Sequence, residues 1–237
     1  MNYSYMDCLA ELGIGGAHPG GLPLTKQLLS QVPIQDGTTV LDAGCGTGRS
    51  SAYVKEHFAC QVTALDNHQT MVKKAKQRFL SHNLPIEVQH GSTESLPFEK
   101  STFDIILSES VIAFTDASRT VNEFSRVLKP TGVLLAVEMV VEKAIPMKEV
   151  NEIKEFYGLS ELLTVDEWDS LFQQAGFQDR KILTFTSQFD AHDPDHAPEF
   201  LLSENLDDVH FDILKEHEQL IEKYKDVLGY RMFRCTV

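Results

Sequence analysis

Three glycines at alternate positions, Gly44, Gly46 and Gly48, follow an apolar pair and an acid in the segment VLDAGCGTGRS at 40–50. Glycine tolerates a positive φ and has no Cβ, so a backbone built from it can turn tightly and approach a ligand closely. The sequence after the third glycine is helical in pattern, and the first turn of a helix offers unpaired N–H donors to an anionic group. The segment therefore predicts a buried strand, a ligand-binding turn and a helix that points its N-terminus at the ligand.

The spacing and the preceding acid narrow the choice of ligand. Dinucleotide sites space their glycines G-x-G-x-x-G, whereas this loop is G-x-G-x-G. Asp42 stands two residues before the first glycine, where a carboxylate repels a pyrophosphate and attracts an amine cation. S-Adenosylmethionine (SAM) carries such an ammonium, beside a carboxylate that helix N–H groups can bind. A glycine-rich turn without a ligand is the alternative.

A second acid ends the next predicted strand, Gln61–Asp66, 24 positions after Asp42. An acid at the tip of the second strand can accept hydrogen bonds from both hydroxyls of a ribose. Asp66 could instead cap the following helix; we favour the ribose contact and assign the cap to Asn67. Met71 belongs to the apolar side of that helix and is predicted to be a core residue within reach of an adenine.

Three strings carry a family resemblance. LDAGCGTG at 41–48 resembles motif I of the class I SAM-dependent methyltransferases, while SLPF at 95–98 and RVLKPTG at 126–132 are most similar to the ubiquinone/menaquinone-biosynthesis and related small-molecule methyltransferases. The resemblance covers about 36–140. It implies an α/β, Rossmann-like fold: a seven-stranded, mostly parallel sheet of order 3-2-1-4-5-7-6, with strand seven antiparallel and helices on both faces. It also implies methyl transfer from SAM to a small-molecule acceptor, with Cys45 as a small residue in the cofactor loop.

The loop after the third predicted strand departs from the family pattern. Its sequence at 91–98, GSTESLPF, resembles a family segment in which an acid contacts the adenine amine, but here Ser92 stands at that position. A serine hydroxyl can accept from the amine without the strength that a charge adds. The resemblance therefore places the adenine contact among Ser92, Thr93 and Glu94, either weakened at Ser92 or shifted to Glu94.

Candidate catalytic residues follow the fourth predicted strand. Ligands in open parallel sheets lie beyond the carboxyl ends of the strands, so Ser108 and Glu109 are expected beside the cofactor and the methyl acceptor. Glu109 is the best-placed general base; a helix-start carboxylate or a recognition group for a cationic acceptor is an equally good interpretation. His18 is the second candidate base, provided that the N-terminal arm closes over the site. Methyl transfer needs alignment and exclusion of water more than a protein nucleophile.

We expect a single domain over residues 1–237, with an N-terminal lid and helix at 1–35, a SAM-binding core at 36–140 and a C-terminal part at 141–237 that shapes the acceptor pocket. Residues 1–22 are too rich in glycine and proline for a regular element and are interpreted as a flexible arm or a lid. Pro23 is predicted to open a helix. Helices are also predicted at 147–157, 165–176 and in about 198–227, and strands at 181–186 and 230–237.

Composition limits the partners. A formal charge of −14 argues against nucleic acid and anionic membranes. The four cysteines show no metal-ligand spacing, and the His and Asp residues of 192–196 are interpreted as a solvated acidic loop, so no metal is expected. Residues 1–12 lack a signal peptide and the apolar stretch 132–141 is too short to span a bilayer, which predicts a cytoplasmic protein. The oligomeric state stays open.

Two other classes of function compete with a methyltransferase. A SAM-binding module without catalysis would use the same loop and the same two aspartates. A nucleotide-dependent oxidoreductase on a similar sheet is disfavoured by the glycine spacing and by Asp42.

Overall fold

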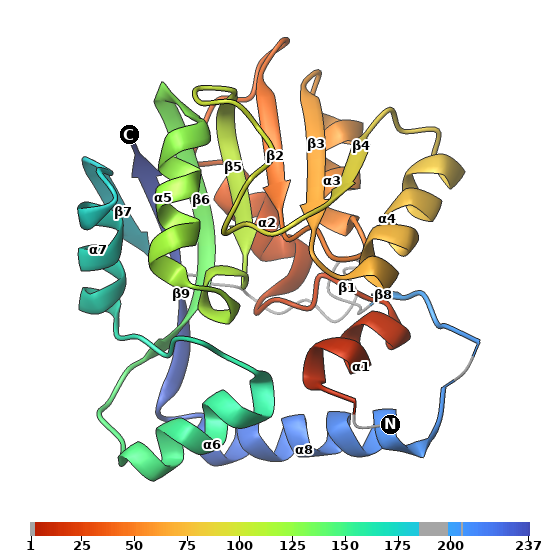
Figure 1. Cartoon of the computed structure of the whole chain (residues 1–237), viewed down its shortest axis with the longest axis vertical. Coiled ribbons are helices and arrows are strands. Elements are labelled where there is room, and N and C mark those ends of the chain that lie inside the picture. The colour runs from red at the N-terminus through yellow and green to blue at the C-terminus, as the bar shows by residue number, and fades with distance from the viewer. Residues whose placement is uncertain (1–2, 185–198, 205) are drawn as a thin grey trace.

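A seven-stranded sheet forms the centre of the protein in the computed structural model, which describes residues 3–184, 199–204 and 206–237 (Figure 1). The strand order is β4-β3-β2-β5-β6-β9-β7. The first five are parallel, and β9 is antiparallel to both β6 and β7. In chain order this is 3-2-1-4-5-7-6 with the seventh strand antiparallel, so the predicted topology is confirmed. The strands are β2 Thr39–Ala43, β3 Gln61–Asp66, β4 Glu87–His90, β5 Phe103–Glu109, β6 Leu128–Val141, β7 Asp179–Leu183 and β9 Leu228–Thr236.

Helices cover both faces of the sheet. Alternate strand residues point to opposite sides, so Leu41 and Ile106 join one apolar core while Val40 and Ile105 join another. The first core packs against α5 and α7, and the second against α2 and α3, with α5 in front of the sheet in Figure 1 and α2 and α3 behind it. The helices are α1 Tyr5–Leu12, α2 Gly21–Leu29, α3 Arg49–His57, α4 Gln69–Ser81, the 3-10 helix η1 Ile112–Phe114, α5 Ala117–Val127, α6 Met147–Tyr157, α7 Val165–Gln174 and α8 Asp208–Tyr224.

Three helices gather at the carboxyl ends of the parallel strands. Figure 1 shows α1, α6 and α8 together below the sheet. Tyr5 of α1 meets the ring of Tyr157 of α6 edge-on, with ring centroids 4.9 Å apart, and the Cys8 thiol donates to the carbonyl of His210 in α8 at 3.3 Å. Helix α1 is therefore packed at the end of the sheet where ligands of this fold class bind.

The prediction that residues 1–22 form no regular element was wrong. Ser4 and Asp7 form a capping box, in which each side chain bonds to the other residue's backbone N–H, and α1 follows. The helix ends at Gly13, whose φ of +63° is left-handed. The glycines and the proline that led to this prediction lie after α1. In that stretch, β1 Ile14–Gly15 pairs with β8 Glu199–Phe200 in a separate two-stranded sheet.

Several boundaries also differ from the sequence predictions. Helix α2 begins at Gly21, two residues before Pro23. Residues 129–132 of the RVLKPTG string lie inside β6, where a register shift against β5 accommodates the extra residues. In the C-terminal part α8 is shorter than expected, and residues 185–186 and 192–196 lie outside the described residues. In the described ranges, no helix has the length and apolarity needed to cross a membrane.

Glu138 continues β6 instead of interrupting it. Its fully buried carboxylate accepts backbone N–H groups from Val111 at 3.2 Å, Ile112 at 2.9 Å and Ala113 at 3.4 Å. Burial raises the pKa of Glu138 to about 7, although these hydrogen bonds favour the carboxylate. Glu138 thus fixes the start of η1, the segment that follows Glu109 at the end of β5.

The raised pKa of Glu138 predicts a pH-dependent stability. An acid whose pKa is higher in the folded state binds more protons there, so its contribution to the free energy of unfolding falls as pH rises from about 4.5 to 7. Urea unfolding at pH 5 and pH 8 should show that Glu138→Gln removes a pH-dependent component on the order of 3 kcal/mol. The exposed Glu87→Gln variant should retain it. An unchanged pH dependence in Glu138→Gln would contradict the assignment.

Candidate functional site

The glycine loop after β2 is wrapped around the end of β3. Gly44 and Cys45 donate their N–H groups to the carbonyl of Leu65 at 2.8 and 3.0 Å. Gly46 N–H donates to Asp66 Oδ2 at 2.8 Å, and the other carboxylate oxygen accepts from His68 N–H at 2.8 Å. Burial raises the pKa of Asp66 in spite of these hydrogen bonds. The predicted neighbourhood of loop and second acid is therefore present.

The three glycines of the loop have different surroundings. A Cβ added to Gly44 would lie 2.3 Å from Val111 Cγ2, and one added to Gly48 would lie 2.5 Å from the ring of Phe79. A Cβ added to Gly46 would meet no atom of the described residues within 4 Å. All three have a positive φ. Gly44 and Gly48 are thus required by packing, whereas Gly46 borders the open space in which a ligand would meet the backbone.

Asp42 is buried beside the start of α3. Its Oδ2 accepts a hydrogen bond from the Ser51 hydroxyl at 2.5 Å, and Asp42 is only 3% exposed. Burial, with the negative charge of Glu109 second, raises the pKa of Asp42 to about 7. Among the residues that the structure describes, neither Asp42 nor Asp66 nor Glu109 forms an ion pair with a lysine or an arginine.

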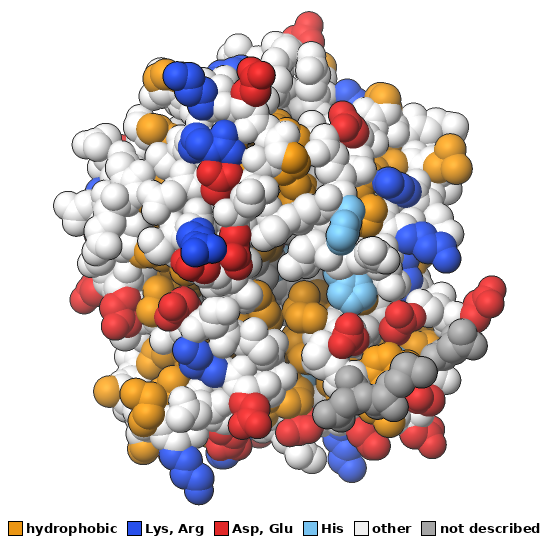
Figure 2. All heavy atoms as spheres, in the orientation of Figure 1, with side chains coloured by type: hydrophobic (Ala, Val, Ile, Leu, Met, Phe, Trp, Pro, Cys, Tyr) orange, Lys and Arg blue, Asp and Glu red, His pale blue; other side chains and the backbone are white. Residues whose placement is uncertain are grey.

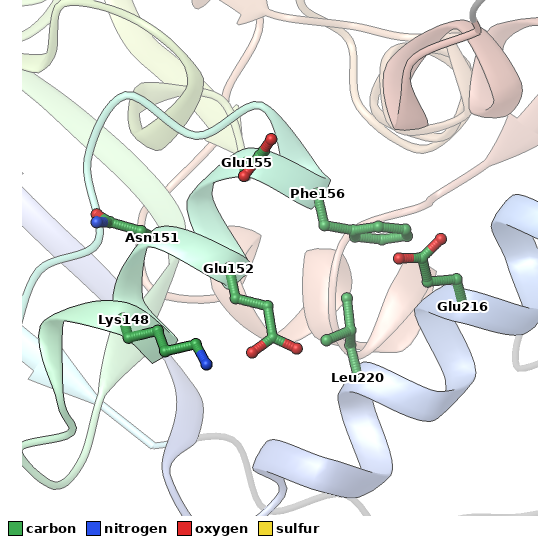
Figure 3. A pocket seen from close by; sticks show the side chains of 7 residues that line it. All are labelled: Lys148, Asn151, Glu152, Glu155, Phe156, Glu216 and Leu220. Carbon is green, nitrogen blue, oxygen red and sulfur yellow. The ribbon is translucent and has the colours of Figure 1, made fainter.

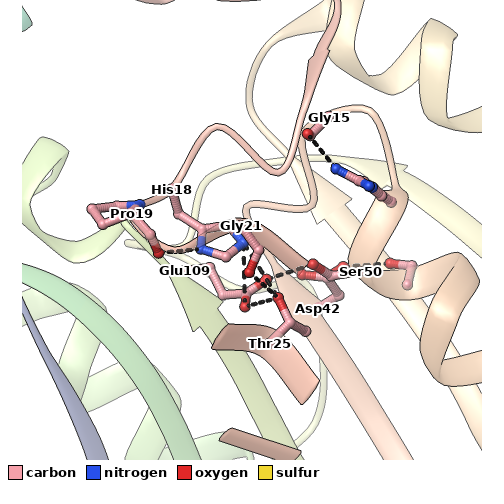
Figure 4. Close-up of polar contacts among 10 residues, drawn as sticks. Gly15, His18, Pro19, Gly21, Thr25, Asp42, Ser50 and Glu109 are labelled. Carbon is pink, nitrogen blue, oxygen red and sulfur yellow. Dashed lines mark hydrogen bonds and ion pairs between the residues drawn. The ribbon is translucent and has the colours of Figure 1, made fainter. Parts of the chain in front are cut away.

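Both predicted catalytic residues meet at the end of β5 (Figure 4). Glu109 Oε1 accepts the Thr25 hydroxyl at 2.6 Å and Oε2 accepts the Ser50 hydroxyl at 2.5 Å. His18 Nε2 lies 3.5 Å from Oε1, and both side chains are about 5% exposed. His18 Nδ1 lies 3.1 Å from the carbonyl of Pro19. A carbonyl oxygen only accepts, so Nδ1 carries a proton and Nε2 is left facing Thr25 and Glu109.

Sequence reasoning missed the hydroxyls that hold the acids. Ser50 and Ser51 are the second and third residues of α3, so their position directly after the glycine loop was a usable signal. Thr25 is fully buried in α2 between Leu24 and Leu28. A polar residue on such an apolar helix side requires a partner, but the sequence does not say which one.

The predicted adenine loop uses its polar side chains internally. Ser92 is exposed and its hydroxyl accepts the N–H of Glu94 at 3.1 Å. Glu94 Oε1 accepts the N–H of Asp116 at the start of α5 at 3.0 Å, and the buried Thr93 hydroxyl lies 3.3 Å from that of Thr120. Contact between this loop and the cofactor stays a prediction.

The remaining predicted residues divide into core and surface. Asn67 does not cap the next helix: it is exposed, and His68 is the residue at the N-cap. Met71 is buried in the core and Cys45 packs among small side chains below the loop. Ser108 is completely buried, and its hydroxyl has no hydrogen-bond partner in the described part of the chain. Because successive residues of a strand point to opposite faces of the sheet, Ser108 lies on the face opposite to Glu109.

Two segments distant in sequence cover the loop together. We call residues 11–18 and 199–203 the cover. Backbone hydrogen bonds and the β1–β8 pair join its two halves. Arg78 Nη1 lies 2.9 Å from Glu199 Oε1 and Arg49 Nη1 donates to the carbonyl of Gly15 at 3.3 Å. Thr47, inside the loop, is 2% exposed. The contacts of Arg49 and Arg78 thus attach the cover to α3 and α4.

A separate cavity of about 790 Å³ lies between α6 and α8 (Figure 3). Its lining shares no residue with the glycine loop or the Glu109 cluster, so we place the candidate site at the strand ends instead. The lining residues are Lys148, Asn151, Glu152, Glu155, Phe156, Glu216 and Leu220. Acidic side chains gather along this lower part of the molecule, over α1, α6 and α8 (Figure 2). Three or more potential metal ligands do not cluster anywhere in the described ranges.

Comparison with known proteins identifies the family. Residues 41–136 match the model of a methyltransferase domain. The chain is 35% identical over 229 residues to the uncharacterized methyltransferase YodH of Bacillus subtilis, and the match covers 97% of each chain. The chain belongs to the class I SAM-dependent methyltransferases. SAM is accordingly the cofactor of this methyltransferase. The narrower resemblance to the quinone-biosynthesis enzymes stays a prediction.

Solved structures share the fold of this methyltransferase. A phosphoethanolamine N-methyltransferase 2 from Haemonchus contortus, bound to phosphomonomethylethanolamine and S-adenosylhomocysteine, matches with a TM-score of 0.71 at 18% identity, over 98% of this chain and 57% of that one. A geranyl diphosphate C-methyltransferase from Streptomyces coelicolor, bound to Mg²⁺, geranyl diphosphate and S-adenosylhomocysteine, matches with a TM-score of 0.70 at 17% identity, over 91% and 78%. At such identities the likeness concerns the fold.

The residues at the strand ends fit SAM. In the described residues neither Asp42 nor Asp66 forms an ion pair with a lysine or arginine, which suits a ligand that carries an ammonium and a ribose. The open space at Gly46 admits its close approach to the backbone, and the N-terminus of α3 suits its carboxylate.

Proposed function

We propose that this methyltransferase transfers a methyl group to a small-molecule acceptor held at the carboxyl ends of β2, β3 and β5. The observation that carries the proposal is the proximity of three acids: Asp66 accepts the Gly46 N–H, and the charges of Asp66 and Glu109 both act on Asp42. None of the three forms an ion pair with a lysine or arginine in the described residues. SAM, when bound, supplies a methyl group on a positively charged sulfur, so a site rich in uncompensated negative charge suits it.

Each residue then has a stated role. Asp42 would bind the ammonium of the cofactor, Asp66 the ribose hydroxyls, and the N-terminus of α3 the carboxylate. Glu109 would bind the acceptor and take up a proton, and His18 Nε2, 3.5 Å away, would pass that proton on.

A small acceptor agrees with the size and burial of the site. The cover and α1 close the edge of the sheet, which leaves little room for a folded macromolecule. The net charge of −14 opposes nucleic acid. Matched solved structures hold a phosphobase in one case and an isoprenoid diphosphate in the other. We also propose the division into an N-terminal lid and helix at 1–35, a SAM-binding core at 36–140 and a C-terminal part at 141–237 that shapes the acceptor pocket, and a cytoplasmic setting.

Two measurements on one preparation test the function. Isothermal titration calorimetry should detect uptake of SAM, and incubation with methyl-labelled SAM and a metabolite extract should yield labelled small molecules by mass spectrometry. Label found mainly in protein or nucleic acid would contradict a small acceptor. Uptake of SAM without any labelled product would favour a binding module.

We further propose that the cover must open for SAM to exchange. Glu199 fastens it through Arg78, and hydrogen bonds between charged groups contribute about 1.5–3 kcal/mol. Glu199→Gln should therefore speed SAM dissociation roughly tenfold, as surface plasmon resonance would measure. Glu204→Gln, an exposed change in the neighbouring segment, is the matched control and should leave the rate unchanged. Equal rates of SAM dissociation from the parent protein, Glu199→Gln and Glu204→Gln would show that Glu199 does not hold the cover closed.

A further inference from the structure

We infer that the group methylated by this enzyme is an amine. The inference rests on the proposed function and concerns the acceptor end of the site, where Glu109 lies. It follows from the charges around Glu109, from the way its carboxylate is held, and from the direction in which charge moves during methyl transfer.

Among the residues that the structure describes, no lysine or arginine forms an ion pair with Glu109, and the basic group beside it is His18 Nε2 at 3.5 Å. Lys74 Nζ donates to the carbonyls of Glu11 and Leu201. Arg78 donates to the carbonyl of Thr47 at 2.8 Å and to Glu199. Both cations therefore bind the cover and the loop, while Arg78 Nη2 has no hydrogen-bond partner among the described residues.

The third cation near the loop is also engaged. Arg49 Nη1 donates to the carbonyl of Gly15 at 3.3 Å, and its Nε lies 3.6 Å from Glu199.

Two like charges 4 Å apart repel by about 4 kcal/mol at an effective dielectric constant of 20. A thiolate, phenolate or carboxylate reacting beside Glu109 would meet that repulsion.

The Glu109 carboxylate is positioned by neutral donors. Thr25 and Ser50 each give one hydroxyl hydrogen bond, one to each oxygen, at 2.6 and 2.5 Å. A carboxylate has about four lone-pair positions, so both oxygens can still accept N–H donors from a ligand. Because the hydroxyls bring no positive charge, the negative charge of Glu109 stays available to a cation.

Methylation of an amine moves positive charge toward this carboxylate. The nitrogen lone pair forms the new N–C bond as the C–S bond breaks with its electron pair on sulfur, so the positive charge passes from sulfur to nitrogen. A primary or secondary amine then gives one proton to Glu109, directly or through His18 Nε2, and from there to solvent. An anion placed where positive charge develops stabilises the transition state more than the free amine.

Thr25 and Ser50 act in this scheme as positioning residues. Thr25→Val and Ser50→Ala keep side-chain size while removing one donor each. Both should reduce the affinity for a methylated amine less than Glu109→Gln does, because the charge itself is retained.

The experiment locates the label and then measures binding. The labelled product from the extract should carry its methyl on nitrogen by tandem mass spectrometry; a label on oxygen, sulfur or carbon overturns the inference while leaving the methyltransferase function intact. Absence of any labelled product would contradict the proposed function instead.

The second measurement needs no turnover. The identified product is titrated calorimetrically into protein saturated with S-adenosylhomocysteine. Glu109→Gln should weaken its binding at least tenfold, while the remote Glu155→Gln control should not. Equal affinities in the two variants, with thermal melts showing both folded, would overturn the role of Glu109 as the amine-binding carboxylate.

Discussion

Gly46→Ala is expected to abolish measurable SAM binding while the protein stays folded. The new methyl group would enter open space, since no atom of the described residues lies within 4 Å of it. The cost to folding is limited to the left-handed backbone at φ +54°, about 1–2 kcal/mol for a non-glycine residue. A ligand that approaches this backbone closely would lose at least 100-fold in affinity, as calorimetry would measure.

Gly37→Ala is the matched control for that variant. Gly37 also has a positive φ, +81°, and open space around it, but it lies in the turn before β2. It should lose about the same 1–2 kcal/mol of stability in urea unfolding and keep its SAM affinity. Similar SAM affinities for Gly46→Ala and Gly37→Ala would mean that the ligand does not approach Gly46.

Asp42→Asn is expected to weaken SAM binding by about 10–100-fold at pH 7.5, since a hydrogen bond between charged groups contributes about 1.5–3 kcal/mol. The parent protein should also bind SAM more tightly as pH rises from about 5 to 7. Burial and Glu109 raise the pKa of Asp42 to about 7, so the attractive carboxylate becomes populated over that range. The α-ammonium of SAM keeps its charge there, because α-amino groups titrate near 7.7–8.0.

Calorimetric titrations at several pH values test this assignment of Asp42. In Asp42→Asn the affinity should lose most of its dependence on pH between 5 and 7, whereas the exposed Asp36→Asn control should keep it. A parent protein whose SAM affinity falls as pH rises in this range would show that Asp42 does not face the ammonium.

The sheet and the cofactor half of the site were predictable because they depend on local patterns. Apolar runs that end in Asp42 and Asp66 identify neighbouring parallel strands, and the glycines between them fix the turn. Even so, sequence reasoning treated the three glycines alike. That two of them are required by contacts with Val111 and Phe79, residues far away in the chain, is a fact of packing.

The acceptor half could be predicted only in part. Glu109 and His18 were identified from position, but their partners depend on tertiary contacts that span 59 and 84 residues of sequence, from Glu109 to Ser50 and to Thr25. The error over residues 1–22 had a local cause. The capping box at Ser4 was present in the sequence, yet the glycines that follow α1 dominated the interpretation.

The succession of Ser50 and Ser51 in one helical turn has a consequence for how the ligands bind. One hydroxyl holds Glu109 and the next holds Asp42, so the acids that we propose bind the acceptor and the cofactor share a rigid support. Any ligand that fixes the position of one carboxylate also fixes the first turn of α3, and thereby the position of the other carboxylate. We therefore expect synergism: each ligand should raise the affinity of the other, and by thermodynamic reciprocity the two enhancement factors must be equal.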